Sequence, residues 1–414
     1  MACILLHTHT FSPDGVSTGY VMTDLARQLI RRGHAVKVLT TTPHYNTDPS
    51  ALARQPLHRF LLGLVYRSEI DGISVWHIKV PMKGTRIYSR VFDFVYYHLM
   101  SFLVGWLAVG SFDIVIAPSP PLTMGVMGWL LSLRHGVPSV YNVQEIYPDF
   151  AVHQGLITNT LLIRILQVIE RFVYRRNNAV VTISQWFSDI IRSRGIPEGK
   201  LYVIPNSVDT ELYRPLPRDN EFAREYQLLD SFVVMYGGNV SINLDWLTVL
   251  RAAEDLTALP IQFVVVGGGG RMDWLAAEVS GRKLMNVKLI GYQSRDLMPL
   301  INASSDLCTI PMKRNTTKDG FPSKIYTIMA SGKSVLVEAD EDSELRWLVQ
   351  HVRCGRVVGP EEPAVYTAAI RQAFGERQLL QEEGMRGREY VLTRYSTQEV
   401  GRSFDKLIHV LTSR

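Results

Sequence analysis

The sequence is poor in cysteine and in unbalanced charge. Its 414 residues include three cysteines, which form no CxxC pair and lie too far apart for a zinc site or a disulfide framework. We therefore expect a reducing, cytoplasmic compartment. Lys and Arg total 44 against 39 Asp and Glu, a net charge of +5. This small excess does not favour nucleic acid as a partner, but it suits an anionic membrane surface or a phosphorylated substrate.

Long apolar runs are also lacking. The segment 91–108 is the best candidate for a membrane span, but it contains Asp93 and His98 and barely reaches the ~20 apolar residues that a span needs. The apolar start of the chain has no basic residues and runs directly into a polar His-Thr-His-Thr loop. We expect a buried first strand there and no secretory signal.

Common catalytic motifs are missing as well. There is no G-x-S-x-G nucleophile elbow. His7, His9 and His44 form no spaced ligand set with cysteines or carboxylates. The acidic run 340–342 imitates a DxD metal motif, but its position after an apolar run is typical of a solvated loop. We expect no bound metal and no cofactor.

Short apolar runs alternate with amphipathic segments, a pattern typical of α/β folds with parallel sheets. We expect strands at ACILLH, AVKVLTT, ISVWHI, DIVIAP, SVYNV and AVVTIS, and then at FVVMYGG, IQFVVVGGGG, NVKLIGY, DLCTIPM and SVLVEAD. Closely spaced prolines indicate a linker between the two groups. We therefore predict an N-terminal domain (1–204), a linker (205–217), a C-terminal domain (218–395) and a last helix (396–414).

The first loop that contains glycines is FSPDGVSTGY, which follows an apolar run and leads into a helix. Gly15 and Gly19 would let the backbone approach a ligand beside the free N–H groups of the helix start, although a plain strand-to-helix turn fits as well. The loop is not GxGxxG, and no acidic residue closes the second strand. A nicotinamide dinucleotide site is therefore disfavoured.

The stretch 313–332 is more informative. A polar Asp-Gly-Phe turn precedes Pro322, which we expect to begin a helix with Ser323 and Lys324 in its first turn. Unpaired backbone N–H groups and a lysine ammonium would meet there and suit a diphosphate. An ordinary capped helix with a solvent-facing lysine has the same pattern.

Several motifs occur together in an order that resembles glycosyltransferase family 4: VIPNSVDTELYRP, VVVGGGG, NVKLIGY, DLCTIPM and DGFPSKIYTIMASGK. GHAVKVLTTTPHYN and NVQEIYPDFAVHQGLI look like a branch that builds bacterial surface polysaccharides and transfers fucose-like or N-acetyl-aminosugar residues. The resemblance extends from Leu5 to about Tyr395. It implies the GT-B fold, in which two Rossmann-like domains face each other across a cleft. It also implies retaining, metal-independent transfer from a nucleoside diphosphate sugar, UDP- or GDP-linked.

The resemblance assigns roles in the donor site by position. The family's Glu-x7-Glu pattern falls here on Asp319 and Thr327. Asp319 would bind hydroxyl groups of the donor sugar, while Thr327 occupies the ribose position without offering a carboxylate. The diphosphate would be held by the backbone of Gly320, Phe321, Pro322 and Ser323.

Cationic residues are scarce in this expected donor site. Many relatives have an Arg and a Lys-Gly after the first strand of the second domain, where this chain has Asn239 and Asn243. Lys324 would then be the chief cationic partner of the leaving phosphate. Tyr292 lies where relatives line the nucleotide base, and the glycines 267–270 would permit close packing with the nucleotide.

On the acceptor side, many family members have a histidine where this chain has Gln144 and Glu145, with Asp149 four residues further. Glu145 would orient the acceptor hydroxyl or take its proton, although the donor phosphate can itself act as the base. An ordinary loop carboxylate for Glu145, and a helix cap for Asp149, are the alternatives.

Two N-terminal segments, 91–108 and 160–178, combine aromatic or aliphatic surface with basic residues. In the second, Arg164, Arg171 and Arg175 lie near one side of a helix, as in helices that lie on anionic lipids. A helix packed on its own sheet has the same pattern. The family's acceptors are often polyprenyl diphosphate-linked sugars, so we expect peripheral attachment to the cytoplasmic face of the membrane.

We therefore expect a retaining glycosyltransferase that adds one sugar to a lipid-linked saccharide during assembly of lipopolysaccharide, capsule or exopolysaccharide. Two other enzymes would keep the fold: a nucleotide-sugar 2-epimerase, which needs more acids and histidines in the cleft, and a soluble glucan synthase, which needs no aromatic-basic surface helices. A third alternative is a non-catalytic nucleotide-sugar binding module. The Asn239 region and Thr327 are its only support.

Overall fold

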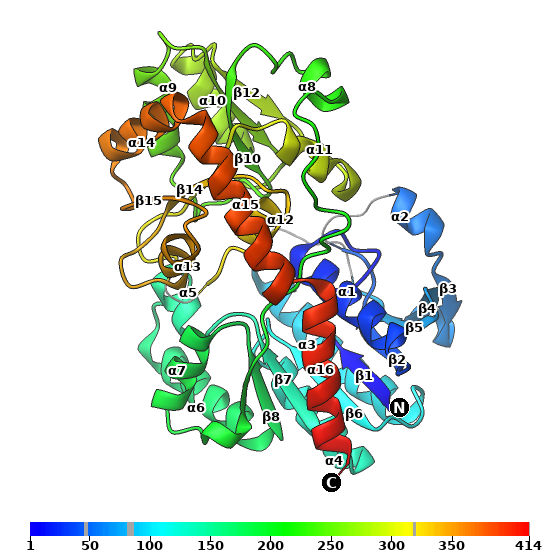
Figure 1. Cartoon of the computed structure of the whole chain (residues 1–414). Helices are drawn as coiled ribbons and strands as arrows, with labels where there is room; N and C mark the ends of the chain where they lie inside the picture. The colour runs from blue at the N-terminus through cyan, green and yellow to red at the C-terminus, as the bar shows by residue number, and fades with distance from the viewer. Residues whose placement is uncertain (45–48, 81–86, 318–319, 414) are drawn as a thin grey trace. The chain divides into compact units, whose positions relative to one another are not determined.

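The computed structural model describes residues 1–44, 49–80, 87–317 and 320–413. The chain forms two units. Unit 1 comprises Met1–Val152, Ile157–Ser207 and Thr397–Arg414, and unit 2 comprises His153–Leu156 and Val208–Ser396. Each unit contains a mostly parallel sheet with helices on both faces (Figure 1). The predicted α/β class is confirmed.

The sheet of unit 1 has nine strands in the order β3-β4-β5-β2-β1-β6-β7-β8-β9. They are β1 Cys3–His7, β2 Ala35–Thr41, β3 His58–Phe60, β4 Val65–Ile70, β5 Ile73–Ile78, β6 Ile114–Pro118, β7 Ser139–Val143, β8 Ala179–Thr182 and β9 Leu201–Val203. All six runs expected in this half form strands. Strands β3 and β4 pair antiparallel at one edge, and β9 lies at the other. These three were not predicted: β3 and β9 are short edge strands open to solvent, and β4 mixes polar and apolar residues, so none carries a continuous apolar run.

The helices of unit 1 are α1 Ser17–Arg31, α2 Pro49–Arg54, α3 Ile87–Leu107, α4 Met124–His135, α5 Asp149–His153, α6 Thr160–Arg176, α7 Gln185–Ser193 and α16 Thr397–Thr412, with short 3-10 turns at Leu61–Gly63 and Glu198–Lys200. On one face of the sheet, α1 lies beside α16 (Figure 1), and both contribute to one apolar core. On the other face α3 and α4 pack on the central strands, and α6 packs on α4. No helix in the described part of the chain has both the length and the hydropathy for crossing a membrane.

Unit 2 has a six-stranded parallel sheet in the order β12-β11-β10-β13-β14-β15. Its strands are β10 Phe232–Gly237, β11 Ile261–Val266, β12 Val287–Ile290, β13 Leu307–Pro311, β14 Val335–Glu338 and β15 Gly355–Val358. Its helices are α8 Glu221–Glu225, α9 Trp246–Asp255, α10 Met272–Gly281, α11 Met298–Ala303, α12 Lys324–Ala330, α13 Glu344–Val352, α14 Pro363–Gly375 and α15 Arg377–Arg394, with a 3-10 turn at Arg295–Leu297. All five expected strands are present, and only the short edge strand β15 was not predicted.

Each sheet has a switch point, at which the loops after two neighbouring strands lead to opposite sides of the sheet. In unit 2 the strands proceed from β10 to β12 on one side and from β13 to β15 on the other, so the switch point lies between β10 and β13. In unit 1 it lies between β1 and β6. In parallel α/β sheets ligands bind beyond the carboxyl ends of the strands at such a point, because the two adjoining loops diverge there. The fold of unit 2 therefore brings together the loop after β10 and the loop after β13.

Candidate active site

Lys324 is the central cation at the switch point of unit 2. Its Nζ atom lies 3.6 Å from the centroid of the Tyr236 ring, at the end of β10. The Tyr236 hydroxyl donates a hydrogen bond of 2.6 Å to the backbone oxygen of Asn239. Burial lowers the pKa of Lys324 to about 7 because the ammonium ion loses water. Among the described residues no carboxylate pairs with it, so a bound anion would provide the missing counter-charge.

The glycines after β10 and β11 allow two backbones to touch. A Cβ on Gly267, whose φ is +147°, would lie 2.0 Å from the backbone oxygen of Gly238. A Cβ on Gly269 would lie 2.2 Å from Oδ1 of Asn239. The Gly238 N–H donates to the oxygen of Val266 at 2.9 Å. This packing brings the loop after β10 beside Lys324, because a Cβ on Gly238 would lie 3.1 Å from Nζ.

The other predicted donor residues are less closely grouped. Asp319 lies outside the described residues. The expectation that Pro322 begins the helix is wrong, because α12 begins at Lys324. Pro322 and Ser323 form a turn before it, in which their backbone oxygens accept N–H bonds from the next turn at 3.1 Å. The helix has seven residues, so its dipole contributes less than a long helix would.

Side chains around this turn are engaged locally. Phe321 stacks on Tyr326, with ring centroids 5.3 Å apart. The Thr327 hydroxyl donates to the backbone oxygen of Lys324 at 2.8 Å. Asn239 is exposed, and Tyr292 is exposed in the loop after β12. Gly320 is half-buried before the turn. The donor-site roles of all these residues remain predictions.

In unit 1 the loop after β1 packs tightly on its own helix. A Cβ on Gly19 would lie 3.1 Å from the backbone oxygen of Asp14. The Asp14 carboxylate accepts the backbone N–H of His44 at 3.0 Å, which connects this loop to the end of β2. Val16 precedes α1 without a side-chain cap. Gly19 is therefore required for close packing, while Gly15 is half-buried in the same loop.

Buried histidines gather beneath this loop, a feature that sequence reasoning missed. His7 is fully buried, and within the described residues neither ring nitrogen has a hydrogen-bond partner. Burial lowers the pKa of His7 and of His9 to about 3. His98 from α3 bonds Thr123 at 2.6 Å, and burial lowers its pKa to about 4. These histidines are neutral at pH 7 and add no positive charge. Their clustering depends on α3 folding over β1, which no local pattern indicates.

Glu145 follows β7 and is half-buried. Burial raises the pKa of its carboxyl group to about 7, and it makes no hydrogen bond within the part of the chain that the structure describes. Its neighbour Gln144 is fixed, because its N–H donates to Ser119 at 2.8 Å and its side chain accepts from Asn206 at 2.6 Å. Glu145 is thus placed on a rigid turn with a carboxyl group that can gain or lose a proton near pH 7.

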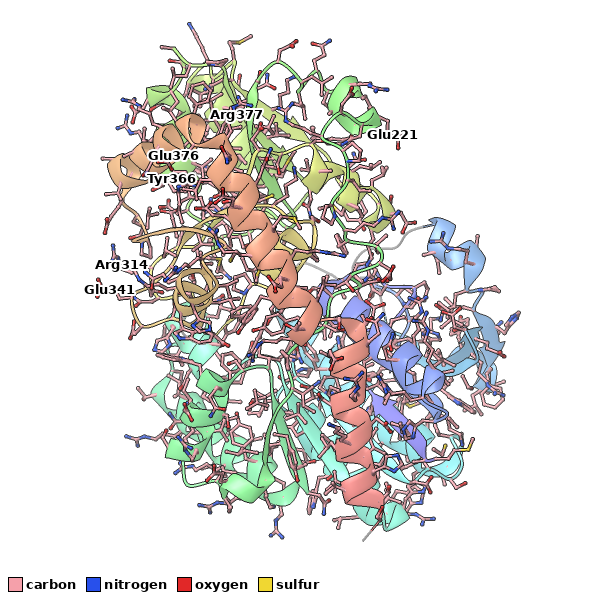
Figure 2. All side chains as sticks on the ribbon, viewed as in Figure 1. Glu221, Arg314, Glu341, Tyr366, Glu376 and Arg377 are labelled. Carbon is pink, nitrogen blue, oxygen red and sulfur yellow. The ribbon has the colours of Figure 1, made fainter. Side chains whose placement is uncertain are left out.

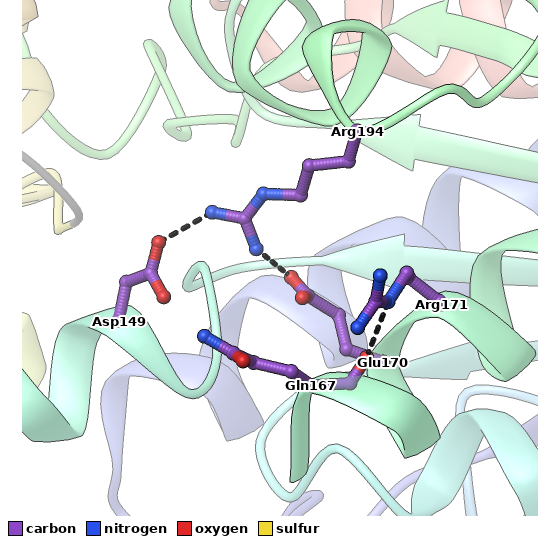
Figure 3. Close-up of a pocket in the computed structure, with 5 residues that line it drawn as sticks. All are labelled: Asp149, Gln167, Glu170, Arg171 and Arg194. Carbon is purple, nitrogen blue, oxygen red and sulfur yellow. Dashed lines mark hydrogen bonds and ion pairs between the residues drawn. The ribbon is translucent and has the colours of Figure 1, made fainter. Parts of the chain in front are cut away.

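Asp149 has a different environment. Its carboxylate and that of Glu170 both pair with the guanidinium group of Arg194 (Figure 3). A pocket of about 320 Å³ lies here, lined by Asp149, Gln167, Glu170, Arg171 and Arg194. The Asp149 carboxylate is therefore engaged in an ion pair with Arg194, which Glu170 shares. Sequence reasoning missed Arg194, because its carboxylate partners lie 45 and 24 residues away.

A His-Asp-His group joins α16 to the rest of unit 1. Asp405 lies 2.8 Å from Nε2 of His34 and 3.2 Å from Nε2 of His409. The arrangement has the composition of a metal ligand set. However, Nδ1 of His34 accepts the N–H of Ala2 at 3.3 Å, which leaves the ring proton on Nε2, where it donates to Asp405. The group is therefore a hydrogen-bonded link between α16 and β1.

Two family models match the chain in succession. Residues 18–207 match the family described as Glycosyl transferase 4-like domain. Residues 231–376 match the family described as Glycosyl transferases group 1. The first match covers most of the N-terminal part of unit 1, and the second covers the sheet of unit 2 with its glycine loops and Lys324.

Known proteins show the same relationship over longer spans. The colanic acid biosynthesis glycosyl transferase WcaI of Escherichia coli K12, so named, is 25% identical over 97% of this chain and 98% of its own length. The lipopolysaccharide 1,2-N-acetylglucosaminetransferase of Salmonella typhimurium is 22% identical over 56% of this chain and 62% of its own length. Among solved structures, Anabaena HepE in complex with UDP and glucose has a TM-score of 0.74 and 17% identity, covering 99% of this chain and all of its own. Both units thus resemble glycosyl transferases in sequence, and the chain is a glycosyltransferase with the GT-B fold.

Proposed function

We propose that this glycosyltransferase moves one sugar from a nucleoside diphosphate sugar to a polyprenyl diphosphate-linked saccharide during bacterial surface polysaccharide assembly. The observation that carries the proposal is the buried Lys324 ammonium at the switch point of unit 2, which pairs with no carboxylate among the described residues. Support for the donor class comes from HepE, which was solved with UDP. Support for the pathway comes from the names of WcaI and the Salmonella transferase. A UDP- or GDP-linked deoxy- or N-acetylaminosugar is the favoured donor.

In the proposed reaction the bond between the anomeric carbon and the diphosphate oxygen breaks, and a bond to the acceptor oxygen forms on the same face of the sugar. Lys324 stabilises the negative charge that develops on the leaving diphosphate. The acceptor proton passes either to a donor phosphate oxygen, with Glu145 orienting the hydroxyl, or to Glu145 itself. Asp319 binds sugar hydroxyl groups. No metal ion takes part.

Transfer to an acceptor is favoured over the alternative activities. WcaI, a named glycosyl transferase, matches nearly the whole chain. A 2-epimerase needs more titratable groups near the donor than Glu145 and Asp149 offer, and Arg194 already neutralises Asp149. A soluble glucan synthase gives no reason for the exposed apolar and basic surface on α3 and α6. A binding module without activity gives no reason for the raised pKa of Glu145.

The first test is a thermal-shift panel of UDP, GDP, ADP and their common sugars, with and without EDTA. We expect one nucleotide class to raise the melting temperature selectively, and EDTA to leave that shift unchanged. A shift that EDTA abolishes contradicts metal independence. The absence of a shift with every nucleotide favours the non-catalytic alternative and contradicts the proposed donor site.

Replacing Lys324 by alanine should weaken binding of the selected nucleoside diphosphate by about 1–3 kcal/mol, roughly 5- to 160-fold in Kd, because a charge-assisted contact is lost. Calorimetric titration measures the change. The matched control is Lys283→Ala, an exposed lysine before the edge strand β12, away from the switch point. Glu145→Gln should leave nucleotide affinity unchanged while lowering turnover. Equal affinity of Lys324→Ala and the parent chain removes Lys324 from the site.

We also propose that unit 1 attaches to the cytoplasmic face of the inner membrane through α3, α4 and α6. Exposed apolar side chains follow each other at helical spacing: Val95, Leu99, Leu103 and Leu107 on α3, and Leu161, Ile165 and Val168 on α6. Arginines flank this surface. Arg134 lies 5.1 Å from the Trp106 ring, and Arg176 lies 5.6 Å from the Phe172 ring. Arginines beside apolar side chains suit the headgroup region of anionic lipids.

The double variant Ile165→Ser with Val168→Ser should lose most of its flotation with anionic vesicles at low salt, because it removes apolar surface that would enter the lipid. Met285→Ser is the control, since it removes an even more exposed apolar side chain from unit 2. Flotation in a density gradient gives the bound fraction. Lack of association of the parent chain with anionic vesicles rules out the proposed attachment.

A further inference from the structure

Two carboxyl groups meet in the interior of unit 2. Glu338 is the last residue of β14 and is fully buried, and Asp245 precedes α9 with 4% of its surface exposed. The backbone N–H of Thr248 donates to Asp245 Oδ1 at 3.2 Å, and that of Glu361 donates to Glu338 Oε1 at 3.2 Å. Within the described residues the other oxygens, Asp245 Oδ2 and Glu338 Oε2, have no donor. The Asp245 N–H donates to the backbone oxygen of Pro311, which is the sheet partner of Glu338, so the fold brings the two carboxyl groups close together.

Among the residues that the structure describes, no cation pairs with Asp245 or Glu338. Besides Asp245, the titratable groups that act on Glu338 are Glu361 after β15 and, on α14, Tyr366, which is labelled in Figure 2. The Tyr366 hydroxyl is engaged with Thr309 at 2.6 Å. The Arg314 guanidinium pairs at 3.5 Å with Glu361. Burial and the neighbouring Asp245 raise the pKa of Glu338 to about 9.

Two buried carboxylates in contact are unstable when both are ionised, since each lacks water and repels the other. A proton between them removes one charge and provides the donor that both free oxygens lack. When two carboxyl groups share a buried site, their titrations are coupled, and one of them keeps its proton while the other ionises. The pair therefore holds one proton at neutral pH.

The pair lies where three loops of the candidate donor site join. The Asp245 N–H donates to the oxygen of Pro311 at 2.8 Å, and the Lys313 N–H donates to that of Asn243 at 3.0 Å. Pro311 is the sheet partner of Glu338. These bonds connect the loop after β10 to the loop after β13, which continues to Lys324.

The loop after β14 also contacts this segment. The Asp340 carboxylate accepts the N–H of Asn315 at 3.0 Å and the hydroxyl of Thr317 at 2.8 Å. Glu338 precedes Asp340 by two residues, so the buried pair and the bonds that anchor Asn315 and Thr317 share one short stretch of backbone.

We propose that Asp245 and Glu338 share one proton and form a positioning element that holds the loop after β13, and with it Lys324, for the donor diphosphate. Loss of the proton separates the two carboxylates and loosens the loop. The part of this proposal that concerns the donor rests on the proposed function. The shared proton itself does not.

The sign of the pH effect follows from the raised pKa. The folded chain holds the proton up to about pH 9, whereas an unfolded glutamate releases it near pH 4.5. The stabilisation is therefore complete below about pH 4.5 and is lost as the pH rises through about 9. Between these values one proton is released on unfolding, so the unfolding equilibrium constant should rise about tenfold per pH unit from this group alone.

The decisive variant is Glu338→Gln. Its amide oxygen still accepts the Glu361 N–H, while its amide N–H can donate to Asp245 without any titration. Urea unfolding at pH 6, 7, 8 and 9, followed by a signal from unit 2, compares the variant with the parent chain. We expect the ratio of their unfolding constants to change about tenfold per pH unit. Other titrating groups, Lys324 included, are present in both proteins and cancel.

Glu341→Gln is the matched control, since it makes the same change at an exposed position three residues further on (Figure 2). It should follow the parent chain at every pH. If Glu338→Gln does not fold, Asp245→Asn tests the same pair by replacing its other carboxyl group. Parallel pH dependences of the parent and the folded variant overturn the shared proton.

Nucleotide titration at pH 7 and pH 9 tests the positioning role. We expect the affinity of the parent chain to fall at least threefold more than that of Glu338→Gln over this interval. If unfolding follows the prediction but the two affinities fall equally, the pair does not position the donor loop. If no nucleotide binds either protein at any pH, the proposed function fails, while the unfolding data still decide the shared proton.

Discussion

Replacing Gly267 by alanine should destabilise unit 2 by about 3–5 kcal/mol and weaken nucleotide binding together with stability. A Cβ at this position would lie 2.0 Å from the backbone oxygen of Gly238, and the residue has a φ of +147°. Such a conformation costs an L-residue about 1–3 kcal/mol, and a clash with a backbone atom adds about 1–3 kcal/mol. The clashing atom is a backbone oxygen, which cannot rotate away as a side chain could. The loop that lies against Lys324 must therefore move.

Urea unfolding, monitored through hydrogen exchange in unit 2, measures this loss of stability. Gly270→Ala is the control in the same loop, because nothing lies within 4 Å of its added Cβ and its φ lies outside the left-handed range. We expect that variant to change stability by less than about 1 kcal/mol. A similar loss in both variants would mean that the loop tolerates no side chain for reasons other than the contact with Gly238.

Acidification should unfold unit 1 between about pH 6 and pH 4. Burial lowers the pKa to about 3 for His7 and His9 and to about 4 for His77 and His98. In the unfolded chain these groups bind protons below about pH 6.5. Their contribution to stability is complete above that pH and is lost as the pH falls toward the folded values.

The expected effect is large. Each histidine takes up about one proton on unfolding in this interval, which removes on the order of 1.4 kcal/mol per pH unit. The four together remove roughly 5 kcal/mol per pH unit, so two units exceed the stability of many domains. Glu338 acts in the opposite direction in unit 2, where lower pH preserves its proton. The two units should therefore differ in acid resistance.

Hydrogen exchange monitored by mass spectrometry separates peptides of the two units and tests this prediction. We expect peptides from β1, β2 and β5 to lose protection before those from β10 and β11. His7→Leu should make unit 1 more resistant to acid, because a buried titrating group that has no hydrogen-bond partner among the described residues is replaced by an apolar one. The exposed His58 serves as the control through His58→Leu. Simultaneous loss of protection in both units would argue against the buried histidines as the cause.

Most of the strands that the sequence predicted share one property. They are apolar runs that are buried on both faces of a parallel sheet, as in Val335–Glu338 and Ile114–Pro118, whereas Val287–Ile290 is a half-buried edge strand. The strands His58–Phe60 and Leu201–Val203 lie at sheet edges, are largely open to solvent and have no such run. Their conformation depends on the neighbouring strand, which a local pattern does not reveal.

Local sequence was sufficient for the fold class, the interior strands and the lysine turn of the candidate donor site, because hydrophobic period and turn chemistry act over a few residues. Only the tertiary structure placed Tyr236 beneath Lys324, neutralised Asp149 with Arg194 and joined Asp245 to Glu338. The partners in these contacts are separated by tens of residues along the chain. Protonation and charge pairing depend on which groups burial brings together, and the sheet order decides that.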